Sequence, residues 1–227
     1  MKVAVLDFVA PFEGGHEFVG EGELLVNWME RALPDAAYHV WKIAHDDRIP
    51  DLSSFDAFIV GGSDKGVYDD EPWMEPLRPF LLEARRIEKP LVGVCFGHQI
   101  MADTFGGTAE KSDKGNQVGV RSFVIDGSEQ TAHVWHQDQV TKKPADAELI
   151  GTADYCPFAV LQYPFPALSM QFHPEFTRSA MLGLIDLVSG RALSPELAEE
   201  ARASILAQSV AVDLMAERAA AVLSGKS

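Results

Sequence analysis

The chain has 227 residues, of which 47% are apolar and 23% are charged, a composition typical of one folded globular domain. Its net charge of −15 would repel nucleic acid phosphates and anionic lipids, so we exclude nucleic acid and membrane surfaces as partners. The N-terminal apolar segment is interrupted by Asp7 too early for a secretory signal, and no apolar run reaches the roughly 18 residues of a membrane span. We expect a soluble, cytoplasmic protein.

The first half of the chain alternates apolar segments of strand length with segments of helical periodicity. We predict strands over residues 2–8, 38–43, 57–60 and 91–94, and helices over 21–33 and 76–87. Such alternation with short connections is typical of a doubly wound, mostly parallel α/β sheet, in which active sites lie at the carboxyl ends of the strands.

The pattern changes after residue 108, where short alternating strands predominate and helical segments return only near the C-terminus. We predict strands over 119–125, 132–135, 158–163 and 167–172, a helix over 179–187, and an Ala-rich helical stretch over 195–223. We expect one domain over residues 1–190 and a helical extension over 191–227 that packs on it as a hairpin. The apolar stripe of the extension leaves a homodimer surface as the alternative.

A Gly-x-Cys-x-Gly turn at Gly93–Gly97 lies between the strand 91–94 and a helical segment. A turn this sharp brings strand and helix so close that only glycine fits two residues to either side of the central residue. The helix N-terminus would favour the thiolate of Cys95, the reactive form of the side chain. Cys95 is therefore a candidate nucleophile, although the same residues could simply pack a tight turn. The other cysteine, Cys156, has no such surroundings and is interpreted as a small buried residue.

A base and a group to orient it occur together in Gln171-Phe-His173-Pro-Glu175, directly after a predicted strand. Proline biases His173 toward an extended backbone, and side chains two apart in such a segment point to the same side, so Glu175 can reach the imidazole. A thiol nucleophile needs this pairing. Taken alone, a His-Pro-Glu sequence could also be a surface turn.

Two further segments are candidate sites. The loop that begins at Gly61 and Gly62 follows a strand, and its glycines prevent a helix, so its N–H groups could be free to face a ligand. His133 and His136 are close in sequence, but no third ligand stands at a zinc-like spacing. We therefore expect no metal there and interpret the pair as part of a solvated or substrate-side loop.

Gly-Gly-Ser at 61–63, Gly-Val-Cys-Phe-Gly-His-Gln at 93–99 and His-Pro-Glu at 173–175, in this order, resemble the class I glutamine amidotransferase family over residues 1 to about 190. The stretches 66–73 and 135–140 are most similar to its stand-alone members that resemble the glutaminase of GMP synthase. The resemblance implies a flavodoxin-like α/β fold with a small antiparallel section, no cofactor, and hydrolysis of the γ-amide of glutamine through a thioester.

The family's functional residues carry over onto matching positions of this chain. The resemblance implies Cys95, His173 and Glu175 as catalytic triad, the backbone N–H groups of Gly62 and Phe96 as oxyanion hole, and Gln99, Val118 and Gly119 as contacts to the amino-acid end of glutamine. The chain departs from the family pattern in two places: Ser63 replaces the usual proline after the double glycine, and Trp135 replaces a serine before His136.

Three functions remain open from the sequence. A small-molecule γ-amide hydrolase, with or without a separate synthetase subunit that accepts ammonia, agrees best with the resemblance. A γ-glutamyl peptide or γ-glutamyl amine hydrolase would use the same triad, and no ATP pyrophosphatase loop that could use ammonia occurs in the chain. A non-catalytic regulatory module would not need the intact Cys-His-Glu set.

Overall fold

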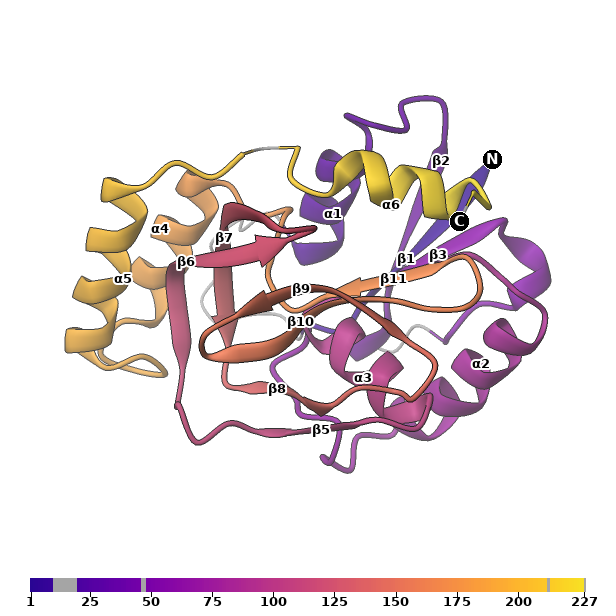
Figure 1. The fold of residues 1–227 in the computed structure, drawn as a ribbon, viewed down its shortest axis with the longest axis horizontal. Helices are drawn as coiled ribbons and strands as arrows, with labels where there is room; N and C mark the ends of the chain where they lie inside the picture. The colour runs from indigo at the N-terminus through magenta and orange to yellow at the C-terminus, as the bar shows by residue number, and fades with distance from the viewer. Residues whose placement is uncertain (10–19, 46–47, 212, 227) are drawn as a thin grey trace.

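The computed structural model describes residues 1–9, 20–45, 48–211 and 213–226, and Figure 1 shows strands at its centre with helices around them. The strands are β1 (Lys2–Asp7), β2 (Ala37–Lys42), β3 (Ala57–Val60), β4 (Leu91–Val94), β5 (Thr108–Lys111), β6 (Gln117–Ile125), β7 (Ser128–His136), β8 (Asp138–Lys142), β9 (Glu148–Ala153), β10 (Cys156–Gln162) and β11 (Ala167–Met170). The helices are α1 (Glu21–Met29), α2 (Met74–Arg86), α3 (Phe96–Thr104), α4 (Arg178–Val188), α5 (Pro195–Ala207) and α6 (Ala216–Leu223), with 3₁₀ turns at Ile43–His45 and Leu52–Ser54.

Within the described residues one sheet has nine strands in the order β2-β1-β3-β4-β11-β10-β9-β6-β7. The pairs from β2 to β11 are parallel, whereas the pairs from β11 to β7 are antiparallel, and β5 pairs with β8 in a small antiparallel sheet. The predicted fold class is thus confirmed. Because β3, β4 and β11 are neighbours, the loops at their carboxyl ends meet at one edge of the sheet.

The inner parallel strands β1, β3, β4 and β11 are buried on both faces because helices cover both faces, whereas the edge strand β2 is partly exposed. Along β1, Val3 and Val5 pack in the same buried cluster as Leu25 and Trp28 of α1, while the alternate residues belong to a second cluster that includes residues of α2 and α3. Figure 1 shows α6 with α1 above the sheet and α2 with α3 below it. This packing on both faces holds the strand ends in position. The residues that follow β3, β4 and β11 are therefore held in position as well.

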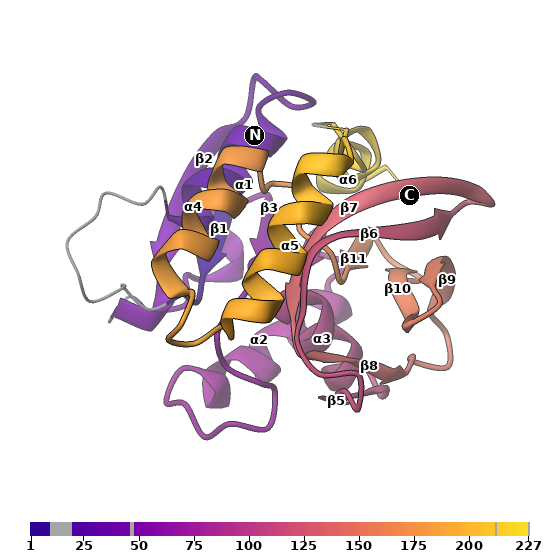
Figure 2. The ribbon, with the colours of Figure 1, turned by 90° about the vertical axis from the view of Figure 1, so that its left-hand side faces the viewer.

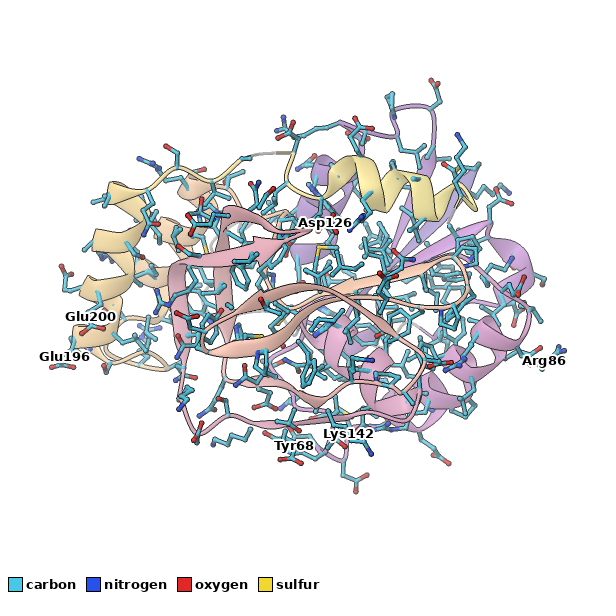
Figure 3. The ribbon with its side chains drawn as sticks, in the orientation of Figure 1. Tyr68, Arg86, Asp126, Lys142, Glu196 and Glu200 are labelled. Atoms are coloured by element: carbon cyan, nitrogen blue, oxygen red, sulfur yellow. The ribbon has the colours of Figure 1, made fainter. Side chains whose placement is uncertain are left out.

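The C-terminal extension differs from the predicted hairpin. Helix α5 packs on α4 and β6, as Figure 2 shows, whereas α6 packs against α1, β4 and β11. The stretch between them is tied to the sheet, because the Thr131 hydroxyl donates to the carbonyl of Ser209 at 2.8 Å. Figure 3 shows Glu196 and Glu200 pointing outward from α5, while Ala198 and Ala201 on the inner face are buried.

Three strands were not predicted. Strands β5 and β8 consist mostly of polar residues, and the apolar residues of β9 do not alternate with polar ones, so the alternation on which the sequence prediction depends is weak in all three. The other elements lie close to their predicted ranges. In the part of the chain that is described, no helix combines the length and apolar character needed to cross a membrane.

Candidate active site

Cys95 lies between the end of β4 and the start of α3, with a φ of 52° and a ψ of −105°. This backbone conformation is strained for any residue with a side chain, and such strain is concentrated at functional positions. Added Cβ atoms would lie 2.6 Å from Met101 Sδ at Gly93 and 2.0 Å from the Val60 carbonyl oxygen at Gly97. The two flanking glycines therefore permit the turn that presents Cys95, as the sequence predicts.

His173 and Glu175 lie directly after β11 and are held against each other. The imidazole Nδ1–H donates to Glu175 Oε1 at 2.6 Å, and both residues are buried. Phe176 stacks on the imidazole, with ring centroids 4.2 Å apart. The carboxylate and the aromatic ring together fix the orientation of the ring, so that Nε2 is available on its other side.

The charges around His173 favour its protonated form. Burial lowers the pKa of His173, but the nearby Glu175 carboxylate and the Cys95 thiolate outweigh burial and leave its pKa well above the ordinary value. The Cys95 side chain is close enough to the imidazole to contribute to this rise of the pKa. An imidazole that can take and return a proton beside a thiol is the arrangement needed for nucleophilic catalysis.

Two further groups contact the sulfur of Cys95. The Gln171 side-chain amide donates to Sγ at 3.8 Å, and Sγ in turn faces the carbonyl oxygen of Trp135 at 3.8 Å. Gln171 was not among the predicted site residues. The available signal was its spacing, because Gln171 stands two residues before His173 at the end of a strand and so points to the same side.

The loop after β3 differs from its prediction. Its backbone N–H groups were expected to be free, yet Gly62 N–H donates to Glu21 Oε1 at 2.5 Å, Lys65 N–H to Ser63 Oγ at 3.1 Å, and Gly66 N–H to Asp69 Oδ2 at 2.9 Å. The expectation was wrong at these three positions because side chains of the protein itself satisfy buried N–H groups. Phe96 N–H, by contrast, belongs to the first turn of α3, where N–H groups have no intrahelical acceptor.

Glu21 is a residue of the site that was not predicted from the sequence. It is the first residue of α1 and is only 8% exposed. The pKa of Glu21 is raised to about 8, chiefly by burial; the carboxylates of Glu175 and Asp7 contribute to the rise, and His173 and the Gly62 N–H oppose it. An acidic residue in the first turn of a helix is common for reasons of helix electrostatics, so its sequence position carried no signal of this burial.

The family model for glutamine amidotransferase class-I matches residues 26–182. The chain belongs to this family. The family resemblance drawn from the three motifs is therefore confirmed, and with it the class of enzyme.

Relatives within and near the family agree with this membership. Gamma-glutamyl peptidase 2 of Arabidopsis thaliana is 28% identical over 171 residues, which cover 70% of this chain and 69% of the relative. A glutamine-hydrolyzing GMP synthase subunit of Archaeoglobus fulgidus is 24% identical over 160 residues, which cover 66% of this chain and 83% of the relative. The crystal structure of a glutamine amido transferase from Methylobacillus flagellatus has the same fold, with a TM-score of 0.74, 19% identity and coverage of 99% of this chain and 95% of that one.

The three residues predicted to bind the amino-acid end of glutamine differ in what they contact in the structure. The Gln99 amide is buried and donates to Asp138 O at 2.8 Å and to Gln171 Oε1 at 3.2 Å. Val118 in β6 pairs with Trp135, whose carbonyl faces the sulfur. Gly119 has a φ of 108°, and a Cβ there would lie 2.3 Å from the Ser204 hydroxyl of α5. Their binding roles stay predictions.

We expected His133 and His136 to lie in a loop. Both lie instead in β7, where they are buried. Their Nδ1 atoms bond to the carbonyl oxygens of Phe176 and Asp138, at 2.8 and 2.9 Å. Burial lowers the pKa of His133, and it lowers the pKa of His136 to about 4, so both stay neutral near pH 7. These bonds tie β7 to the segments that carry Phe176 and Asp138. The strand predicted over 132–135 already includes His133 and extends to His136, and the two histidines, three residues apart, point to opposite faces of it, so the loop interpretation was wrong.

Among the described residues, one cluster has the donor set of a metal site: Glu21, His173 and Glu175 offer ligand atoms within 4.8 Å of one another. Part of this set is used within the protein, because Glu21 Oε1 accepts the Gly62 N–H and Glu175 Oε1 accepts from His173 Nδ1, whereas Glu175 Oε2 has no hydrogen-bond partner among the described residues. These internal hydrogen bonds suit a group of side chains that transfers protons.

Proposed function

We propose that this chain hydrolyses the γ-amide bond of glutamine, giving glutamate and ammonia through a γ-glutamyl thioester on Cys95. The observation that carries the proposal is the buried His173, which is bonded at 2.6 Å to the Glu175 carboxylate and interacts with Cys95 strongly enough to raise the pKa of the imidazole. Membership of the class I glutamine amidotransferase family supports the same chemistry.

The reaction begins when His173 Nε2 accepts the thiol proton and the sulfur attacks the γ-carbonyl carbon. Glu175 stabilises the imidazolium ion and holds the ring in place, as the third member of such triads does. The carbonyl oxygen becomes an oxyanion beside the N–H groups of Phe96 and Gly62. When the intermediate collapses, the C–N bond breaks, and His173 returns its proton to the departing nitrogen, which leaves as ammonia.

The second half releases the acyl group. His173 accepts a proton from water, whose oxygen attacks the thioester carbon, and the C–S bond breaks to give glutamate and the Cys95 thiolate. The same two N–H groups serve the second oxyanion. The position of Phe96 N–H in the first turn of α3, where it has no intrahelical acceptor, supports this role. Gly62 N–H must first be released by Glu21.

A second candidate function is hydrolysis of γ-glutamyl peptides. Relatives named gamma-glutamyl peptidase 2 and gamma-glutamyl peptidase 5 of Arabidopsis thaliana are 28% and 27% identical to this chain over 70% of its length. A γ-glutamyl peptide presents the same γ-carbonyl with a larger leaving group, so the triad chemistry is unchanged. Similarity to the glutamine-hydrolyzing GMP synthase subunit supports a third arrangement, in which a separate synthetase receives the ammonia.

The test is release of glutamate by the purified chain, measured with glutamine and with a panel of γ-glutamyl peptides and amides. Cys95→Ala should reduce kcat/KM on the order of 10⁴-fold, because it removes the nucleophile. Cys156→Ala is the matched control: this second buried thiol lies in β10, and burial raises its pKa to about 12, so its loss should leave kcat/KM unchanged.

The substrate profile separates the candidate functions. Glutamine as the best substrate supports the main proposal, and a γ-glutamyl peptide as the best substrate supports the second. Turnover of glutamine only after addition of a synthetase would support the partner arrangement. Activity that survives Cys95→Ala would refute all three.

A further inference from the structure

The carboxyl group of Glu21 occupies the place where the reaction would build up negative charge. Its Oε1 accepts the Gly62 N–H at 2.5 Å, and its ligand atom lies within 4.8 Å of those of His173 and Glu175. A Cβ on Gly62 would lie 2.6 Å from Glu21 Oε1, so the carboxyl packs directly on this glycine. The oxyanion loop is thus already occupied by a side chain of the protein.

The chemistry of this occupant resembles that of the reaction. A glutamate side chain ends in a γ-carboxyl group, which is the group that hydrolysis of a γ-glutamyl amide produces. A carboxyl oxygen and the oxyanion of a tetrahedral intermediate are both acceptors for the same N–H. One N–H cannot bond fully to both, so Glu21 and the reacting carbonyl exclude each other at Gly62.

We propose that Glu21 is a built-in competitor of the substrate, which holds the oxyanion loop in the free enzyme and withdraws when the γ-carbonyl binds. The proposal rests on the proposed function, because it takes Gly62 N–H as an oxyanion donor. It makes Glu21 a positioning residue that acts through Gly62. Substrates whose other contacts are strong enough to displace Glu21 are turned over, and weakly bound γ-glutamyl compounds are not.

The electrostatic surroundings make this competition depend on pH. Glu21 faces Asp7 from the end of β1 and His173 and Glu175 from the segment after β11, and Glu175 Oε2 is buried with no hydrogen-bond partner among the described residues. Burial raises the pKa of Glu21 to about 8. Below that pH the neutral carboxyl is a weak acceptor, whereas above it the carboxylate holds Gly62 more tightly and repels an oxyanion.

The experiment compares Glu21→Ala with Glu23→Ala. Glu23 lies in the same first turn of α1 and is paired with Lys42 at 3.6 Å, so its variant controls for loss of a first-turn acid. We measure kcat/KM for the best γ-glutamyl substrate and the inhibition constant of glutamate. At pH 9, where the Glu21 carboxyl is ionised, Glu21→Ala should raise kcat/KM about tenfold, mainly through a lower KM, and tighten glutamate binding by a similar factor, as loss of one charge-assisted hydrogen bond implies. Glu23→Ala should change neither.

A pH series supplies the second readout. In Glu21→Gln the side chain remains a neutral acceptor at every pH, so the ratio of kcat/KM at pH 9 to that at pH 7 should exceed the wild-type ratio about fivefold. This variant has nearly the same shape as the wild type and keeps the test available if Glu21→Ala does not fold. Direct calorimetric binding of glutamate gives the same comparison without turnover.

Each outcome has one meaning. A folded Glu21→Ala variant with unchanged or lower kcat/KM and unchanged glutamate affinity overturns the inference while leaving Cys95-dependent hydrolysis intact. Activation of the wild type by a chelator to the level of Glu21→Ala would assign Glu21 to a metal site and also overturn it. Turnover that does not depend on Cys95 refutes the proposed function instead.

Discussion

Two glycine-rich turns follow adjacent strands of the sheet, one after β3 and one after β4, and they use glycine for different reasons. In the elbow after β4, Gly93 and Gly97 are needed because any side chain would collide with neighbouring atoms. In the loop after β3, backbone N–H groups at Gly62, Lys65 and Gly66 are bonded to side chains of the protein. Added Cβ atoms would meet backbone atoms in the elbow, whereas at Gly62 and Gly66 in the loop they would meet side chains, such as Glu21 at Gly62, which can move.

The difference bears on what each turn can do. A steric constraint has no alternative partner, so we expect the position of Cys95 to be the same with and without substrate. A hydrogen bond from Gly62 to a carboxyl group can be exchanged for one to a substrate oxygen. We infer that the nucleophile is preorganised and that the oxyanion donor becomes available on binding. Substitutions in the two turns should therefore differ in kind and in size.

Gly97→Ala should give the largest loss of stability. A Cβ there would lie 2.0 Å from the Val60 carbonyl oxygen, a backbone atom at the end of β3, so strand and helix must move apart. We expect the free energy of unfolding to fall by about 3 kcal/mol, measured by chemical denaturation. Helix propensity alone predicts that the same change raises the free energy of unfolding by about 1 kcal/mol. A measured decrease would therefore show that the steric contact outweighs helix propensity.

Gly106→Ala is the control for this prediction. A Cβ at Gly106 would meet no atom within 4 Å, but the residue has a φ of 98°. It should therefore lose only about 1 kcal/mol, from backbone strain. Equal losses for the two variants would show that close packing at the elbow is not what makes Gly97 necessary.

The elbow could be predicted from the sequence because its determinants are local. Gly93, Cys95 and Gly97 lie within five residues, and the strand before them and the helix after them are both visible as apolar patterns. His173 and Glu175 could be paired for the same reason, since residues two apart after a strand point to one side. The family model then matched the stretch that contains all of them.

The hydrogen bond from Gly62 to Glu21 in the loop after β3 could not be predicted, because its determinants are distant. Glu21 and Gly62 are separated by 41 positions, and their contact depends on how α1 packs over β3. The predicted hairpin at the C-terminus failed similarly, since α5 and α6 have comparable Ala-rich sequences but pack on different strands. Local patterns indicate that a segment is helical and which face is apolar, but the surface that covers that face is set by tertiary packing.

The next prediction concerns the loop after β3 alone. It is the change in the free energy of unfolding with pH, which we rank between the effects of Gly97→Ala and Ser63→Ala. Because Glu21 has a folded pKa of about 8 and an ordinary value of 4.5 when unfolded, the folded protein binds one more proton between these values. Stability must then fall as pH rises through that range. Relative to Glu21→Gln, the wild type should lose about 1.4 kcal/mol per pH unit between about pH 6 and 7.5, measured by urea denaturation.

Glu23→Gln supplies the comparison for this titration, because its carboxyl is partly exposed and paired at the surface. Its stability should follow the wild type across the same pH range. If Glu21→Gln also followed the wild type, Glu21 would be ionised in the folded protein at neutral pH. The loop would then hold a permanent carboxylate rather than a group that titrates.

The smallest expected effect is at Ser63, where this chain departs from the proline of its family. The Ser63 hydroxyl donates to the Phe8 carbonyl at 3.2 Å and accepts from Lys65 N–H at 3.1 Å, so it ties the loop to the end of β1. Ser63→Ala should lower the free energy of unfolding by about 1 kcal/mol, and Ser122→Ala on the exposed face of β6 should lower it by less than about 0.5 kcal/mol. If the two serine variants were equally stable, the Ser63 hydroxyl would not restrain the loop, and the Glu21 contact alone would remain to hold Gly62.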